Sequence, residues 1–63
     1  MDANSLLVGF KYILTPQFPG EKANVEVMKK YESSYLFKDM AFDFEYVLQF
    51  RDLRNYDIED FKA

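Results

Sequence analysis

The stretch that decides the fold runs from Met40 to Phe50 and reads MAFDFEYVLQF. Its large apolar side chains occupy every second position: Met40, Phe42, Phe44, Tyr46, Leu48 and Phe50. The residues between them are mostly small or polar. Because successive side chains of a β-strand point to opposite faces, this period of two predicts a strand over about 40–50, with one aromatic face and one wetter face.

Two earlier segments also predict strands. Residues 6–14 alternate in the same way, with Leu6, Val8, Phe10, Tyr12 and Leu14 on one face. Residues 24–37 carry apolar side chains at most odd positions, namely Val25, Val27, Tyr31, Tyr35 and Phe37. A helix competes in this second segment, because Ala23 just before it and Val27, Tyr31 and Tyr35 within it are spaced by four. Its valines and tyrosines favour the strand.

The connections follow from turn chemistry and register. Residues 15–21 contain two prolines, and Phe18 to Glu21 fits a type II turn, so we expect a loop there. A hairpin that turns at Lys38–Asp39 would join the second and third strands. It would place apolar residues opposite one another on one face: Tyr35 with Phe42, Tyr31 with Tyr46, and Val27 with Phe50.

Beyond Phe50 the alternation fades, and residues 55–63 predict a short C-terminal helix or an ordered tail. The expected fold is therefore mainly β, a three-stranded antiparallel meander in a single small domain over 1–63. A chain of 63 residues buries little surface, and it has no cysteine for disulfides. We therefore expect a homodimer, formed by stacked aromatic faces or by paired edge strands.

Composition excludes several classes of function. Histidine is absent, so triads lose their usual base and zinc sites lose a common ligand. No glycine-rich phosphate loop is present. We expect no enzyme, no metal and no cofactor. No apolar run approaches the roughly 20 residues of a membrane span. The N-terminus lacks the basic residues of a signal peptide, so a cytoplasmic location is expected.

The aromatic content favours a protein-binding function. Seven Phe and five Tyr are many rings for so small a core, and aromatic residues contribute strongly to interfaces. A short acidic chain of net charge −3 without catalytic apparatus is typical of the compact inhibitors that phages and mobile elements encode. A viral-type inhibitor or regulator of a host or defence protein is our first hypothesis.

Candidate partner-binding residues follow from this hypothesis. The proposed anchors are Phe18, Tyr31, Tyr35, Tyr56 and Phe61. Three acidic residues near the C-terminus would steer a basic partner surface: Asp57, Glu59 and Asp60. The plainer interpretation is that the rings fill a thin core and the acids form a solvated tail.

Two other functions remain open. Lys29 and Lys30 precede Tyr31 and Tyr35, a basic and aromatic grouping on which single-stranded nucleic acid could stack. Glu32 and the acidic balance oppose this, so we expect a protein partner rather than nucleic acid. The third possibility is a structural subunit of a larger assembly.

Overall fold

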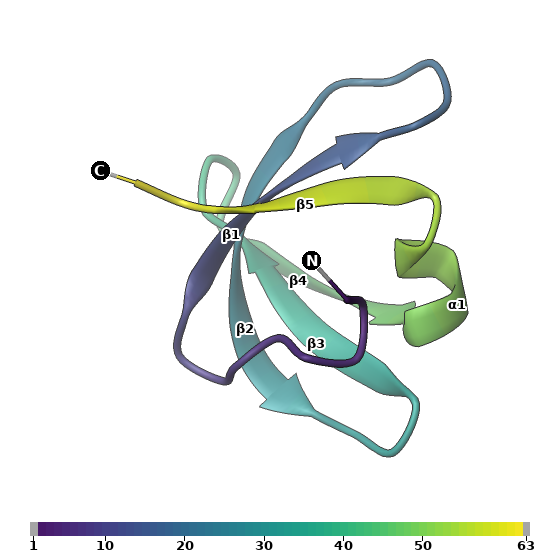
Figure 1. The fold of residues 1–63 in the computed structure, drawn as a ribbon. Coiled ribbons are helices and arrows are strands. Elements are labelled where there is room, and N and C mark those ends of the chain that lie inside the picture. Colours follow the sequence, from purple (N-terminus) through teal and green to yellow (C-terminus); the bar gives the residue numbers. More distant parts are fainter. Residues whose placement is uncertain (1, 63) are drawn as a thin grey trace.

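Five antiparallel strands form one sheet in the order β4-β3-β2-β1-β5 (Figure 1). The computed structural model describes residues 2–62. Along the chain the elements are β1 (Lys11–Pro16), β2 (Ala23–Lys30), β3 (Ser34–Asp39), β4 (Phe44–Gln49), α1 (Phe50–Leu53) and β5 (Tyr56–Asp60). The prediction of a mainly β, antiparallel fold is confirmed, but the sheet has five strands rather than three.

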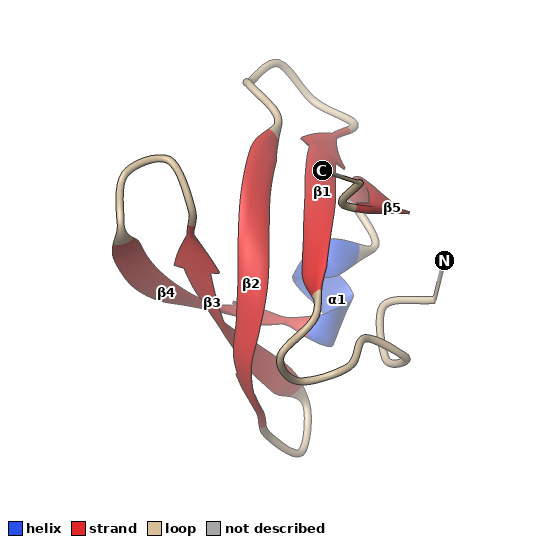
Figure 2. Cartoon of the chain, turned by 90° about the vertical axis from the view of Figure 1, so that its left-hand side faces the viewer, coloured by secondary structure: helices blue, strands red, loops and turns tan. Residues whose placement is uncertain are grey.

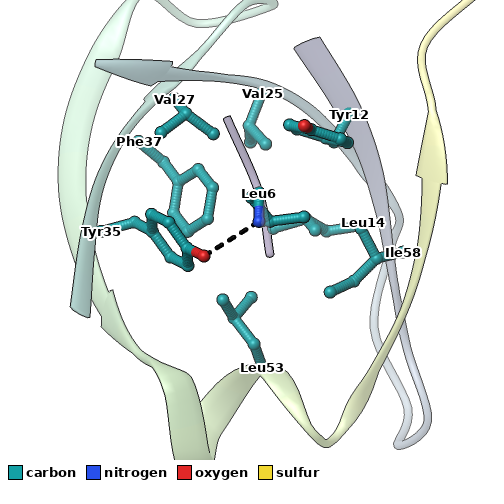
Figure 3. Close-up of a cluster of buried hydrophobic side chains, with 9 residues drawn as sticks. All are labelled: Leu6, Tyr12, Leu14, Val25, Val27, Tyr35, Phe37, Leu53 and Ile58. Atoms are coloured by element: carbon teal, nitrogen blue, oxygen red, sulfur yellow. Dashed lines mark hydrogen bonds between the residues drawn. The ribbon is translucent and has the colours of Figure 1, made fainter. Parts of the chain in front are cut away.

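The sheet is strongly curved, so residues from its two halves face each other across one core (Figure 2). Tyr35 and Phe37 of β3 lie on one side of that core, and Leu14 and Ile58 lie on the other (Figure 3). Leu6 lies between them, at 1% exposure. Each side chain of this size contributes about 1.5–3 kcal/mol when it is fully buried. The remaining core residues are Tyr12, Val25, Val27 and Leu53.

The predicted strand over 6–14 is wrong in its first half, because β1 begins only at Lys11. Residues 7–10 form a turn in which the Phe10 amide donates to the Leu7 carbonyl at 3.2 Å. Gly9 has a φ of 85° in this turn, which glycine adopts without steric cost. The turn lets the preceding segment leave the line of β1 and place Leu6 inside the curved sheet.

The predicted strand over 24–37 is extended, as expected, but it is two strands. β2 ends at Lys30 and β3 begins at Ser34. The Tyr31 amide donates to the Ser34 carbonyl at 2.8 Å and closes the turn between them. A bulge between Val27 and Lys29 shifts the register of the β2–β3 pair. An extra residue of this kind breaks any odd-and-even pattern carried through the segment.

The predicted hairpin register is also wrong. β3 pairs with β4 so that Tyr35 lies opposite Leu48 and Phe37 lies opposite Tyr46. Lys38 and Asp39 end β3 rather than form the turn. The Asp39 carboxylate fixes the turn after itself, because its Oδ1 accepts from the amides of Ala41 at 2.9 Å and Phe42 at 3.0 Å.

The predicted strand over 40–50 shortens to β4, because residues 40–43 form this turn. Alternation does hold within β4. Tyr46 and Leu48 are half-buried, whereas the residues on either side of them are exposed.

The predicted C-terminal helix or tail over 55–63 is replaced by a strand. Ile58 of β5 is buried opposite Leu14 of β1. The helix lies earlier, in α1, where the Gln49 amide donates to the Asp52 carboxylate at 3.3 Å. α1 turns the chain from one outer strand of the sheet, β4, to the other, β5 (Figure 1).

Candidate functional site

Aromatic rings remain on the surface after the core is filled. Within the described residues, five rings are exposed: Phe10, Phe18, Tyr31, Phe42 and Phe44. Phe42 is the most exposed of them, at 77%, in the turn between β3 and β4. A chain of this size therefore leaves large apolar groups available for contact.

A cavity of about 310 Å³ is lined by residues from the β1–β2 loop and from all five strands. Three rings line it, those of Phe44, Tyr46 and Tyr56. Glu21 and Asp39 bring carboxylates to its wall. Leu14 and Ala23 complete the lining. We call this cavity the aromatic cleft.

The rings of the aromatic cleft are held by packing on both sides. Phe44 and Tyr46 share one face of β4, and their ring centroids are 5.5 Å apart. Phe37 of the core packs behind Tyr46, at 6.2 Å between centroids. On the opposite wall, Phe18 meets Tyr56 edge to face, with centroids 5.5 Å apart and an interplanar angle of 80°. Such pairs fix ring orientation better than simple apolar contact does.

The β1–β2 loop is tied to the start of β5. The Gln17 amide donates to the Asn55 carbonyl at 2.7 Å. The side-chain Nε2 of Gln17 donates to Asp57 Oδ1 at 3.1 Å. These two bonds place the loop, and Phe18 with it, against the wall formed by Tyr56.

The electrostatics of the aromatic cleft are negative. Asp39 is only 6% exposed, and no basic residue stands among the described residues of the lining. Burial raises the pKa of the Tyr46 hydroxyl, and the charge of Asp39 and the nearby Tyr56 raise this pKa further. Tyr46 is therefore a neutral hydroxyl at physiological pH, free to donate or accept a hydrogen bond.

The predicted anchors do not gather at one place. Phe18 and Tyr56 meet at the aromatic cleft. Tyr31 is exposed in the β2–β3 turn, and Phe61 is half-buried after β5. Tyr35 is fully buried, so its ring is not part of the surface. The structure thus brings together two of the five anchors.

The predicted acidic residues are all exposed on β5, but they do not share one face. Alternation puts Asp57 and Glu59 on the outer face and Asp60 on the other. None of them lines the aromatic cleft, whose carboxylates belong to Glu21 and Asp39. Sequence reasoning missed these two, and it assigned Phe44 and Tyr46 only to a sheet face. Their alternation was visible, but their position beside Tyr56 was not.

The residues of the nucleic-acid hypothesis form no continuous stacking surface. Tyr35 is buried. The Nζ of Lys30 donates to the Asn4 carbonyl at 2.9 Å and lies 5.8 Å from the centroid of the Tyr35 ring. Lys29 and Tyr31 are exposed, so nucleic-acid binding stays a prediction that rests on these two alone.

A second apolar area lies at the turn before β1. Leu7, Val8 and Phe10 are exposed there by 55%, 54% and 58%. The sequence reading missed this area because it placed these residues in a strand. The sheet also leaves the outer edges of β4 and β5 unpaired within residues 2–62. Self-association through such an edge stays a prediction.

Residues 2–62 contain neither a membrane-spanning helix nor a cluster of metal ligands. No helix there has the length and apolar character needed to cross a membrane. No group of three or more acidic, histidine or cysteine residues is placed to hold a metal ion.

Comparison with known proteins gives no match to a family model, to a curated protein or to a solved structure.

Proposed function

We propose that this chain is a non-enzymatic protein-binding module that docks on its partner through the aromatic cleft and the rings around it. The observation that carries the proposal is the grouping of Phe44, Tyr46 and Tyr56 around one cavity, with the ring of Phe18 packed on that of Tyr56. Interface energy concentrates in aromatic residues that pack in the centre of a contact. Pockets that combine apolar walls with a few convergent polar groups are the usual binding sites of proteins.

The surroundings of the cleft favour a protein rather than a free small molecule. Phe44, which lines the cleft, and Phe18, which packs on Tyr56, are about half exposed, at 50% and 49%. A ligand confined to the cavity would leave much of this ring surface in water. A protein surface would cover the cavity and the rings around it together, and burial of this apolar area would add to affinity.

Charge supports a partner with a basic surface. The chain has a net charge of −3, and acidic side chains line the cleft and β5. Opposite charges on two proteins accelerate their encounter and fix their relative orientation.

A role as a small inhibitor or regulator of viral type fits this size and charge. Light scattering over a concentration series distinguishes this role from that of a structural subunit, because the particle mass of a polymerising subunit would grow beyond that of a dimer.

The test compares two substitutions on the same strand. Phe44→Ser removes a ring from the aromatic cleft, and Val47→Ser removes an exposed apolar side chain from the outer face of β4. Proteins retained by the tagged wild-type chain from a lysate of the organism that encodes it are purified, and their affinities for all three chains are measured. Because a central ring is worth about 2 kcal/mol or more, Phe44→Ser should weaken the partner at least about 30-fold.

Val47→Ser should leave the affinity within about twofold, since peripheral contacts are nearly neutral. Equal affinities for the wild-type and Phe44→Ser chains would show that the partner binds elsewhere and would remove the cleft from the proposal.

A further inference from the structure

We propose that the aromatic cleft receives one protonated side chain, a lysine or an arginine that the partner protein presents. This inference rests on the proposed function and names the group that the cleft recognises. It follows from three properties of the cleft, namely its size, its rings and its charge.

The size of the cavity fits a single side chain. A volume of about 310 Å³ is at the lower end of the range for small-ligand pockets, which begins near 300 Å³. A helix or a strand is too thick to enter such a space. One extended side chain fits, while the backbone that carries it rests on the exposed rings of Phe18 and Phe44.

The rings offer the surfaces that cations prefer. Phe44, Tyr46 and Tyr56 come from two walls of the same cavity. An ammonium or guanidinium group over the face of an aromatic ring is attracted by the negative charge of that face, and the attraction grows when water is excluded. Several rings around one cation form the arrangement known as an aromatic cage. Arginine also stacks its flat guanidinium on a ring.

The carboxylates select a cation over a neutral group. Asp39 is almost fully buried at the cleft wall, and Glu21 is exposed at the same cavity. The basic residue next to Asp39, Lys38, belongs to the other face of β3 and pairs with Asp43 at 2.9 Å. The two amides that donate to Asp39 Oδ1 are neutral, so the carboxylate keeps its negative charge at the cleft wall. A cation in the cleft is attracted by this charge and by that of Glu21, whereas a neutral occupant is not.

The test uses small peptides and the intact chain. Acetylated, amidated, glycine-flanked peptides carry arginine, lysine, citrulline or norleucine at the centre. Citrulline is the neutral counterpart of arginine, and norleucine is that of lysine. Each peptide is titrated into the isotope-labelled chain, and amide chemical shifts are followed by NMR. We expect saturable shifts at Phe44, Tyr46 and Tyr56, with binding at least about tenfold tighter for the cationic peptides.

Two substitutions separate charge from ring. Asp39→Asn removes the charge but keeps an Oδ1 that accepts from Ala41 and Phe42. Phe44→Leu keeps apolar bulk but removes the ring. Each should weaken the cationic peptides about five- to tenfold, since each removes one charged or aromatic contact. Val47→Ser, on the outer face of β4, should change nothing. If the amide signals of Ala41 and Phe42 show that Asp39→Asn disturbs the turn, the loss of charge is no longer isolated, and the result for Phe44→Leu decides the test.

The inference is overturned if citrulline and norleucine peptides bind as tightly as their charged counterparts, if the shifts lie outside the cleft, or if Phe44→Leu binds the cationic peptides normally. The proposed function still holds after any of these results if a protein partner binds the Phe44→Ser chain more weakly than the wild-type chain. The reverse result, cation binding without any partner that depends on Phe44, rejects the proposed function and keeps the site.

Discussion

The hydroxyl of Tyr35 accepts a hydrogen bond from the backbone amide of Leu6, at 3.1 Å, across 29 residues of sequence (Figure 3). A similar bond joins the Leu7 amide to the hydroxyl of Tyr12 at 3.0 Å. Two core tyrosines thus hold the N-terminal segment inside the curved sheet, and the hydroxyl of Tyr35 satisfies the Leu6 amide, which would otherwise be buried without a partner. The hydrogen bonds of these two hydroxyls therefore hold the segment that places the Leu6 side chain in the core.

The first prediction concerns this bond. Tyr35→Phe keeps the ring but leaves the Leu6 amide without its acceptor, so the free energy of unfolding should fall by about 1–3 kcal/mol. Urea unfolding followed by circular dichroism measures the change. Tyr31→Phe is the control, because Tyr31 is exposed in a turn and its substitution should cost less than about 0.5 kcal/mol. Equal stability of both variants would mean that the bond to Leu6 contributes nothing.

The second prediction compares two adjacent leucines. Leu6 is 1% exposed and Leu7 is 55% exposed. Leu6→Ala should lower the free energy of unfolding by about 2–5 kcal/mol, because it opens a hole among the surrounding core side chains. Leu7→Ala should change it by less than about 0.5 kcal/mol. Thermal melts of the two variants give the answer directly, and similar melting temperatures would contradict the placement of Leu6.

The third prediction concerns alkaline pH. Burial raises the pKa values of Tyr35 and Tyr46 in the folded chain. A tyrosine of the unfolded chain titrates at about pH 10, so the unfolded chain loses these protons at a lower pH than the folded chain does. The stability that the neutral hydroxyls provide is complete below this pH and is lost as the pH rises through the higher folded values.

Urea unfolding at pH values from about 9 to about 11 should therefore show a steep loss of stability. The loss should be smaller in Tyr46→Phe, which has one such hydroxyl fewer. At neutral pH the hydroxyls are uncharged in both states, so each variant there reports only packing and hydrogen bonding. An unchanged slope in Tyr46→Phe would mean that its hydroxyl titrates normally.

The fourth prediction concerns the acids of β5, which are exposed. Replacing Asp57 by asparagine, which keeps the Oδ1 that accepts from Gln17, and Glu59 and Asp60 by serine should slow association with a basic partner severalfold at low salt, with little change in dissociation. Stopped-flow or surface kinetics over a salt series measures both rates.

A matched control removes the same charge elsewhere, from the exposed residues Asp2, Glu32 and Glu45. If the control slows association equally, net charge rather than the β5 acids steers the partner. If neither set changes the rate, the acids play no part in the encounter.

Local alternation predicted what depends on neighbouring residues alone. Tyr46 and Leu48 do face the core from β4, because a period of two fixes the faces of a strand without any knowledge of its partners. The extended conformation of residues 23–30 and 34–39 follows equally from their valines and aromatic residues.

Register was not predictable in this way. The bulge near Met28 shifts the register of the β2–β3 pair, and the turn fixed by the Asp39 carboxylate sets where β4 begins. Neither feature is visible in the alternation of apolar residues. The β3–β4 register differs from the expected one by an even number of residues, so each side chain keeps its face, but Tyr35 lies opposite Leu48 rather than Phe42. The burial of Leu6 outside any strand was not predictable for another reason. The segment before β1 shows the same alternation of apolar residues as a strand, although it is not part of the sheet.

The aromatic cleft lay beyond sequence reasoning because distant parts of the chain build it. Phe44 and Tyr46 come from β4, Tyr56 from β5, and Glu21 from the β1–β2 loop. They meet only because β5 crosses the molecule to pair with β1. The contact of Phe18 with Tyr56 depends on the same crossing, so the sequence named both rings as anchors but could not show that they meet.

The most direct test of the proposal is site-specific photo-crosslinking inside the cell that produces the chain. A benzophenone amino acid replaces Phe44 at the cleft in one chain and Val47 on the outer face of the same strand in another. We predict that position 44 yields a covalent product with one discrete protein partner and that position 47 does not. A crosslink to the same partner from position 47 alone, or equal crosslinking from both positions, would contradict docking through the aromatic cleft.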